Sequence, residues 1–177
     1  MADLGQLRTF RACHLASSAV GDVYFRCQRQ GKVAYVREAV VLRTPLSDLL
    51  AIDVPVFAAP MGFISGPELA AAVSNAGGFG IISFSGNPPP VLREEIGRLR
   101  SLTDKPFGVG VLLGGPHLPF PIEAIIDVCL EERVSVLLTF WGDPTPFVAP
   151  AHAAGVKVID QVGSVADAQR AARAHWR

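Results

Sequence analysis

The chain has 177 residues, of which 50% are hydrophobic and 18% charged, and its 16 Lys and Arg residues balance its 16 Asp and Glu residues. This length gives room for one domain with a sizeable core, and the high apolar content excludes an intrinsically disordered protein. Without a basic surplus the chain is not expected to bind nucleic acid, because neutralising the phosphates needs one.

Residues 1–43 differ from the rest of the chain, since they are Arg-rich and show no clean period of 2 or 3.6. We expect an N-terminal extension of uncertain structure. Arg-rich segments with few acids also occur in transit peptides, but the weak amphipathicity here favours a loosely structured extension. No apolar run approaches about 18 residues and no secretory signal opens the chain, so we expect a cytoplasmic protein that does not enter a membrane.

From Thr44 onward the sequence repeats one unit, an apolar run followed by a turn and a helix-like segment. Runs that do not alternate predict strands buried on both faces, as in parallel sheets with crossover helices. The predicted strands are residues 54–61, 79–85, 106–113, 134–140 and 156–162. The predicted helices are residues 66–76, 88–102, 121–132, 144–154 and 164–174.

Five such units predict an α/β fold in which residues 44–177 form an incomplete (β/α)8 barrel with parallel strands in sequential order. A complete barrel takes roughly 250 residues, so we expect the chain to be an N-terminal fragment of one. A strand order that reverses about a central point would instead indicate a doubly wound fold.

Helix ends carry matching signals. Ser65 followed by Pro67 predicts a capped start, and Ser164 with Asp167 predicts a capping box. Gly77 and Gly155 stand where a left-handed residue ends a helix.

The first predicted strand reads Val-Pro-Val-Phe-Ala-Ala-Pro-Met and ends at Met61, and an Ala-Gly-Gly-Phe-Gly segment begins about fifteen residues later at Ala76. These motifs resemble the FMN-dependent nitronate monooxygenase family, whose members are (β/α)8 barrels. The resemblance runs from about Thr44 to about Ala174.

The resemblance implies that Pro60, Met61 and Gly62 contact the FMN isoalloxazine ring at the carboxyl end of the first strand. Barrels of this class build their sites on that face. Without the resemblance, Met61 reads as a core residue and Pro60 as the stop of a strand.

Three further FMN contacts are implied by the same resemblance. Gly110 stands where relatives usually carry an Asn that bonds the flavin, and it offers only backbone. Gln161 matches a polar residue that contacts the flavin or its ribityl chain, and Gly163 opens the next helix. Ser164 beside it reads equally well as an anion-binding helix start or as an ordinary N-cap.

The catalytic residues stay unknown. Many relatives have a His near the substrate after the fourth strand, but here Phe140 and Trp141 occupy that stretch, and neither accepts a proton at neutral pH. Trp141 either walls an apolar substrate pocket or packs in the barrel. The histidines show no ligand spacing and the three cysteines are widely spaced, so no metal site is expected.

The resemblance implies oxidative denitrification of alkyl nitronates with dioxygen, giving a carbonyl compound and nitrite. Relatives bind the FMN phosphate and place a catalytic His after later strands, so we expect weak FMN binding and no nitronate oxidation by this chain alone. The alternatives are an FMN-dependent enoyl-acyl-carrier-protein reductase-like protein and a non-catalytic remnant whose open strand edges pair with a partner, including a homo-oligomer.

Overall fold

The computed structural model describes residues 13–17, 23–29, 32–38, 42–84, 86–114 and 120–175. The chain divides into two compact units, Met1–Leu42 and Arg43–Arg177.

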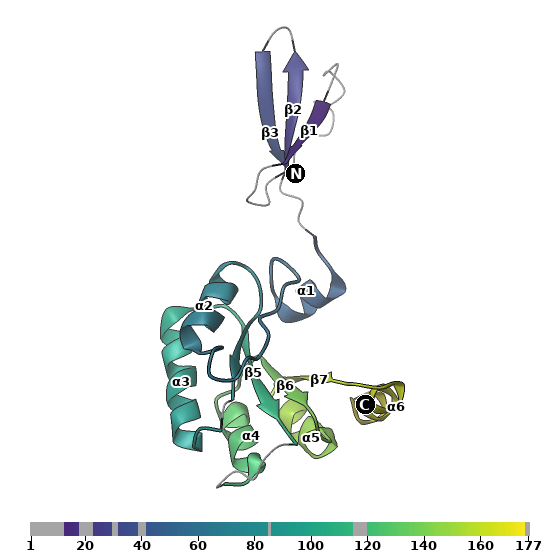
Figure 1. Cartoon of the computed structure of the whole chain (residues 1–177). Helices are drawn as coiled ribbons and strands as arrows, with labels where there is room; N and C mark the ends of the chain where they lie inside the picture. Colours follow the sequence, from purple (N-terminus) through teal and green to yellow (C-terminus); the bar gives the residue numbers. More distant parts are fainter. Residues whose placement is uncertain are drawn as a thin grey trace. The chain divides into compact units, whose positions relative to one another are not determined.

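The first unit contains a three-stranded antiparallel sheet in the order β1-β2-β3 (Figure 1). The strands are β1 (Cys13–Ser17), β2 (Val23–Arg29) and β3 (Lys32–Glu38). The sequence pattern predicted no strand here, because charged and amide residues interrupt the apolar alternation within each short segment.

The second unit is built on a four-stranded parallel sheet in the order β4-β5-β6-β7. Its strands are β4 (Gly80–Ser83), β5 (Phe107–Leu112), β6 (Val136–Phe140) and β7 (Lys157–Gln161). Each strand pairs with the next one along the chain, for example Gly110 with Leu138. The sequential order confirms the incomplete (β/α)8 barrel and excludes the doubly wound alternative.

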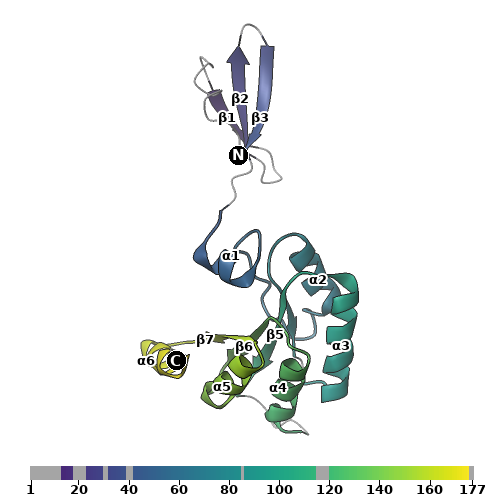
Figure 2. The same cartoon turned by 180° about the vertical axis from the view of Figure 1, so that it is seen from behind.

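Helices alternate with these strands and lie along the outer face of the sheet, except that the last one stands apart beyond β7 (Figures 1 and 2). They are α2 (Pro67–Asn75), α3 (Pro89–Leu102), α4 (Ile122–Glu131), α5 (Thr145–Ala153) and α6 (Val165–His175). All five agree with the predicted helices to within one residue at each end. A short helix that was not predicted, α1 (Pro45–Leu50), precedes them and is capped by Thr44. In the described ranges, no helix has the length and apolar character needed to cross a membrane.

The predicted strand over residues 54–61 is wrong as a regular strand. This segment makes a single parallel bridge, Phe57 with Phe79, in which Ala58 N–H donates to the Phe79 carbonyl at 2.9 Å. Proline explains why the ladder stops: Pro60, two residues further on, has no N–H to donate, and Val56 N–H turns back across Pro55 to the Val54 carbonyl at 2.8 Å.

The predicted helix ends are confirmed except at the start of α2. Gly77 and Gly155 have the left-handed φ values of 90° and 77°. Ser164 Oγ accepts Asp167 N–H at 3.1 Å, as an N-cap does. The N-cap of α2, however, is Gly66, which has no side chain to cap with, so the capping role expected of Ser65 is wrong.

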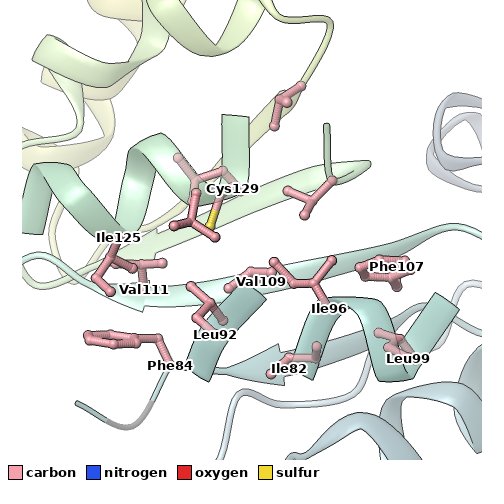
Figure 3. Close-up of a cluster of buried hydrophobic side chains, with 14 of the residues drawn as sticks. Ile82, Phe84, Leu92, Ile96, Leu99, Phe107, Val109, Val111, Ile125 and Cys129 are labelled. Carbon is pink, nitrogen blue, oxygen red and sulfur yellow. The ribbon is translucent and has the colours of Figure 1, made fainter. Parts of the chain in front are cut away.

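The main core lies between the sheet and the outer helices. Figure 3 shows part of it, where Val109 and Val111 of β5 meet Leu92 and Ile96 of α3, all fully buried. The opposite face of the sheet carries a smaller cluster, in which Leu50 at the end of α1 and Ile52 just after it pack with Phe79, Ile81, Val136 and Leu138. The sheet is therefore apolar on both faces, as the non-alternating runs predicted.

The thiol of Cys129 in α4 belongs to the main core, and its ionisation tests whether this core excludes water. Burial raises the pKa of this thiol to about 12, whereas a thiol in an unfolded chain ionises near 9. Its contribution to stability is fully present below about pH 9 and is lost as the pH rises toward about 12, because only the unfolded state releases the proton in that window.

We therefore expect the free energy of unfolding of the wild-type chain to fall by about 1.5–2 kcal/mol more than that of Cys129→Ala between about pH 9 and about pH 10.5. Urea denaturation at each pH measures this difference. Equal pH dependence of the two proteins would mean that the thiol is solvated.

Candidate functional site

The predicted site residues lie at the carboxyl ends of the parallel strands, but in two groups. Pro60 lies against Gly110 of β5, and Met61 and Gly62 follow it in a loop. Gln161 and Gly163 line a separate cleft at the ends of β6 and β7. No described contact joins the two groups, so each is considered by itself.

The first group is organised by a tight loop formed by residues 60–64, called loop 60–64 below. The Met61 carbonyl accepts the N–H groups of Ile64 at 3.1 Å and Ser65 at 2.9 Å, which closes the chain into a turn. The side chains of the loop face solvent, with Met61 41%, Ile64 66% and Phe63 92% exposed. Loop 60–64 thus presents exposed apolar side chains to solvent, while its backbone is held by hydrogen bonds within the turn.

Gly62 is not required by the backbone conformation of this loop. The left-handed residue is Phe63, at φ 62°, and Gly62 is not among the glycines with positive φ. A bulky side chain at positive φ is uncommon, since it costs steric energy that Gly would avoid. The sequence therefore has its glycine one position away from where the turn needs one. Gly62 is exposed, and without a side chain its peptide is open to solvent.

Gly110 is buried beneath Pro60 and does not face solvent. A Cβ at Gly110 would lie 2.5 Å from Pro60 Cβ, closer than two carbon atoms tolerate. Its carbonyl is already engaged, accepting Phe84 N–H at 2.9 Å. Gly110 thus sets the depth at which Pro60, and loop 60–64 with it, rests on the sheet. Whether it also contacts a cofactor stays a prediction.

The second group lines a cleft of about 450 Å³, called the β6–β7 cleft below. Its walls come from the turn after β6, the end of β7 and the first turns of α6, and they include Trp141, Asp143, Asp160, Gln161, Gly163, Asp167 and Arg170. Gln161 and Gly163 are both exposed there. The structure thus brings these two predicted residues together.

Trp141 forms part of the rim of this cleft and is 72% exposed, which excludes the interpretation that it packs inside the barrel. Its φ of 56° is left-handed. Two glycines explain how this conformation is held: a Cβ at Gly114 would lie 2.0 Å from the Trp141 carbonyl oxygen, and a Cβ at Gly142 would lie 2.4 Å from Leu113 Cβ. The turns after β5 and β6 therefore interlock and present the indole at the rim, with its ring edge-to-face with Phe140 at 6.2 Å.

Charge in the β6–β7 cleft is mainly negative, with three carboxylates and one guanidinium among its lining residues. Asp160 Oδ1 accepts the hydroxyl of buried Thr139 at 2.7 Å. Hydrogen bonds from Thr145 hold the pKa of Asp143 below its usual range, and the hydroxyl of Ser164 does the same for the pKa of Asp167. Asp143 and Asp167 are therefore ionised at neutral pH, and this negative charge disfavours a phosphate group in the cleft.

Ser65 and Thr139 are the residues at these sites that sequence reasoning missed. Ser65 was assigned to the helix cap and Thr139 to an apolar strand. Their roles depend on what lies opposite them in space, which no local pattern records. Across the described ranges, no group of three or more His, Cys, Asp and Glu side chains has a metal-binding arrangement.

Comparison with known proteins confirms the resemblance seen in the sequence. Residues 43–124 match the nitronate monooxygenase family model. The chain is 42% identical over 82 residues to nitronate monooxygenase of Paraburkholderia phytofirmans, covering 46% of this chain and 22% of that protein. It is 34% identical over 131 residues to an indene-carboxyl-CoA dehydrogenase of Rhodococcus jostii, covering 74% of this chain and 36% of that protein.

Among solved structures, FabK of Thermotoga maritima superposes with a TM-score of 0.70 at 41% identity, covering 75% of this chain and 42% of that one. The chain thus spans less than half the length of each of these relatives.

The contact between Gly110 and Pro60 makes a prediction about stability. We expect Gly110→Ala to lower the free energy of unfolding by about 1–3 kcal/mol, because the new methyl group overpacks against Pro60. Gly97→Ala is the matched control. Gly97 lies in α3 with nothing within 4 Å of its Cβ position, so this change should stabilise the helix by about 0.5–1 kcal/mol. Urea denaturation measures both, and a Gly110→Ala protein as stable as wild type would show that Pro60 does not rest on the sheet.

Proposed function

Since residues 43–124 carry the sequence of the nitronate monooxygenase family, we propose that this chain provides the flavin-ring side of an FMN-dependent nitronate monooxygenase-like site. The observation that carries this proposal is loop 60–64, in which Gly62 lies exposed although its φ does not call for glycine, next to Ser65, which is bonded to the last residue of β4.

The described residues fit the ring of FMN better than its phosphate. Loop 60–64 offers an open peptide at Gly62 and the exposed side chain of Met61, which suit a flat aromatic ring. Neither group at the strand ends offers a cluster of cations, and the β6–β7 cleft carries a surplus of carboxylates. Charge-assisted contacts are the strong ones for phosphate, so their absence from these described groups lowers the expected affinity.

When bound, FMN would supply the redox chemistry for the oxidation of an alkyl nitronate by dioxygen. The chain's own residues would then bind the flavin and shield it from water. Met61 and Gly62 hold the ring, and Gln161 offers its amide to the ribityl chain. Trp141 and Phe140 provide apolar surface that excludes water, but neither takes up a proton. A preformed nitronate suits such residues better than a neutral nitroalkane, because it needs no deprotonation.

A second candidate function is an enoyl-acyl-carrier-protein reductase-like activity, which the similarity to FabK favours. The two are distinguished by reaction. Flavin binding without nitrite release from an alkyl nitronate above the rate of free FMN is expected of the first, whereas NAD(P)H-dependent reduction of an enoyl thioester supports the second. A chain that binds no flavin and forms colourless oligomers supports a non-catalytic role.

Flavin titration tests the proposal directly. We expect FMN and riboflavin to bind with dissociation constants within about threefold of each other, because the described groups recognise the ring and not the phosphate. We further expect Gly62→Val to weaken both at least about tenfold by covering the peptide. Quenching of flavin fluorescence measures these constants.

Gly97→Val is the control, since it adds the same side chain at an exposed helix position with open space around it. Submicromolar FMN binding with riboflavin far weaker would contradict the proposal and indicate a phosphate site.

A further inference from the structure

Ser65 makes an unusual set of bonds for a residue next to a helix start. Its side chain is 2% exposed. The hydroxyl donates to the Ala59 carbonyl at 2.8 Å and accepts Met61 N–H at 3.1 Å. Both partners precede Ser65 in the chain and flank Pro60. The hydroxyl therefore links the residue before Pro60 to the residue after it, where the chain enters loop 60–64.

The backbone of Ser65 adds two further bonds. Its N–H donates to the Met61 carbonyl at 2.9 Å, so Met61 is bonded to Ser65 through both its N–H and its carbonyl. The Ser65 carbonyl accepts Ser83 N–H at 2.8 Å, which ties the residue to the last position of β4. Ser65 thereby connects loop 60–64, which it bonds through its hydroxyl and its N–H, to the sheet, which it bonds through its carbonyl.

These contacts are not those of a helix cap. The N-cap of α2 is Gly66, and no side-chain bond caps this helix. Pro67 at the first helical position has no N–H to satisfy. The hydroxyl of Ser65 is turned instead toward the loop, where proline cannot contribute an N–H and the chain cannot continue as a strand.

We propose that Ser65 is the positioning residue of loop 60–64, holding Met61 and Gly62 at the height where a flavin ring meets them. This inference rests on the function proposed above. Ser65 does not contact the ligand. It acts through Met61, whose backbone has its direction set by the two bonds to Ser65. Without the hydroxyl, the Ala59 carbonyl and the Met61 N–H lose their protein partner and the loop is free to rotate about Pro60.

The chain offers a matched control in Ser74. This residue is 1% exposed, and its hydroxyl likewise donates to a backbone carbonyl, that of Pro106 at 2.9 Å, and accepts a backbone N–H, that of Gly80 at 3.1 Å. These bonds lie at the start of β4 and just before β5, at the opposite end of the strands from loop 60–64. Ser65→Ala and Ser74→Ala therefore remove equivalent bonds from the two ends of the sheet.

The first readout needs no ligand. The chain has two methionines, Met1 and Met61, so labelling the methionine methyl groups with carbon-13 gives a signal from the loop itself. We expect Ser65→Ala to shift or broaden the Met61 methyl resonance and to speed chymotrypsin cleavage after Phe63. We expect Ser74→Ala to leave both as in wild type, although its melting temperature falls by a similar amount.

The second readout is flavin binding. Ser65→Ala should weaken riboflavin binding about tenfold, Ser74→Ala less than about twofold, and Ser65→Cys should lie between, since a thiol is a weak hydrogen-bonding group of similar size. Ser65→Cys also serves if the alanine variant fails to fold.

An unchanged Met61 signal in Ser65→Ala, or equal changes in both alanine variants, would overturn the positioning role whatever the flavin result. A changed Met61 signal with unchanged flavin affinity would overturn it as well. If the wild-type chain binds neither FMN nor riboflavin, the proposed function fails, and with it the purpose assigned to Ser65.

Discussion

Close approach between backbones is the constraint on which the second unit depends. A Cβ at Gly80 would lie 2.0 Å from the Ala70 carbonyl oxygen, so α2 packs directly onto the backbone of β4. A Cβ at Gly108 would lie 3.1 Å from the Val136 carbonyl oxygen, and Gly110 leaves room for Pro60. Because these positions have no side chain, α2 and the loop before it can lie on a sheet already filled with Val, Ile and Leu.

The same constraint places the candidate site. Pro60 rests in the space left by Gly110, and the segment before it makes only one bridge with the sheet. A regular strand would have carried Met61 and Gly62 into the ladder. Proline ends the pairing early and releases these two residues as a loop, and Ser65 then takes over the hydrogen bonding that the ladder no longer provides. The loop therefore lies outside the strand ladder, but its backbone is still hydrogen-bonded to Ser65.

The two groups of strand-end residues differ in chemistry, and this difference shapes the proposed function. Loop 60–64 is apolar and uncharged, as a ring-binding surface should be. The β6–β7 cleft combines an exposed indole with a surplus of ionised carboxylates. The proposed function therefore assigns only the flavin ring to the loop and places no phosphate in the cleft.

The sequence predicts those features of the fold and the candidate site that depend on interactions between residues close together in the chain. Local periodicity, glycine at helix ends and apolar runs determined five helices and four parallel strands, because each of these signals acts within a few residues. The motif around Pro60 identified the loop but predicted a strand there, and it assigned Ser65 to the wrong partner. Only the tertiary structure showed that Gly110 lies under Pro60, that Trp141 faces solvent and that Gln161 shares its cleft with three carboxylates. Those facts depend on contacts between residues far apart in the chain, whose distances are set by the packing of the whole sheet.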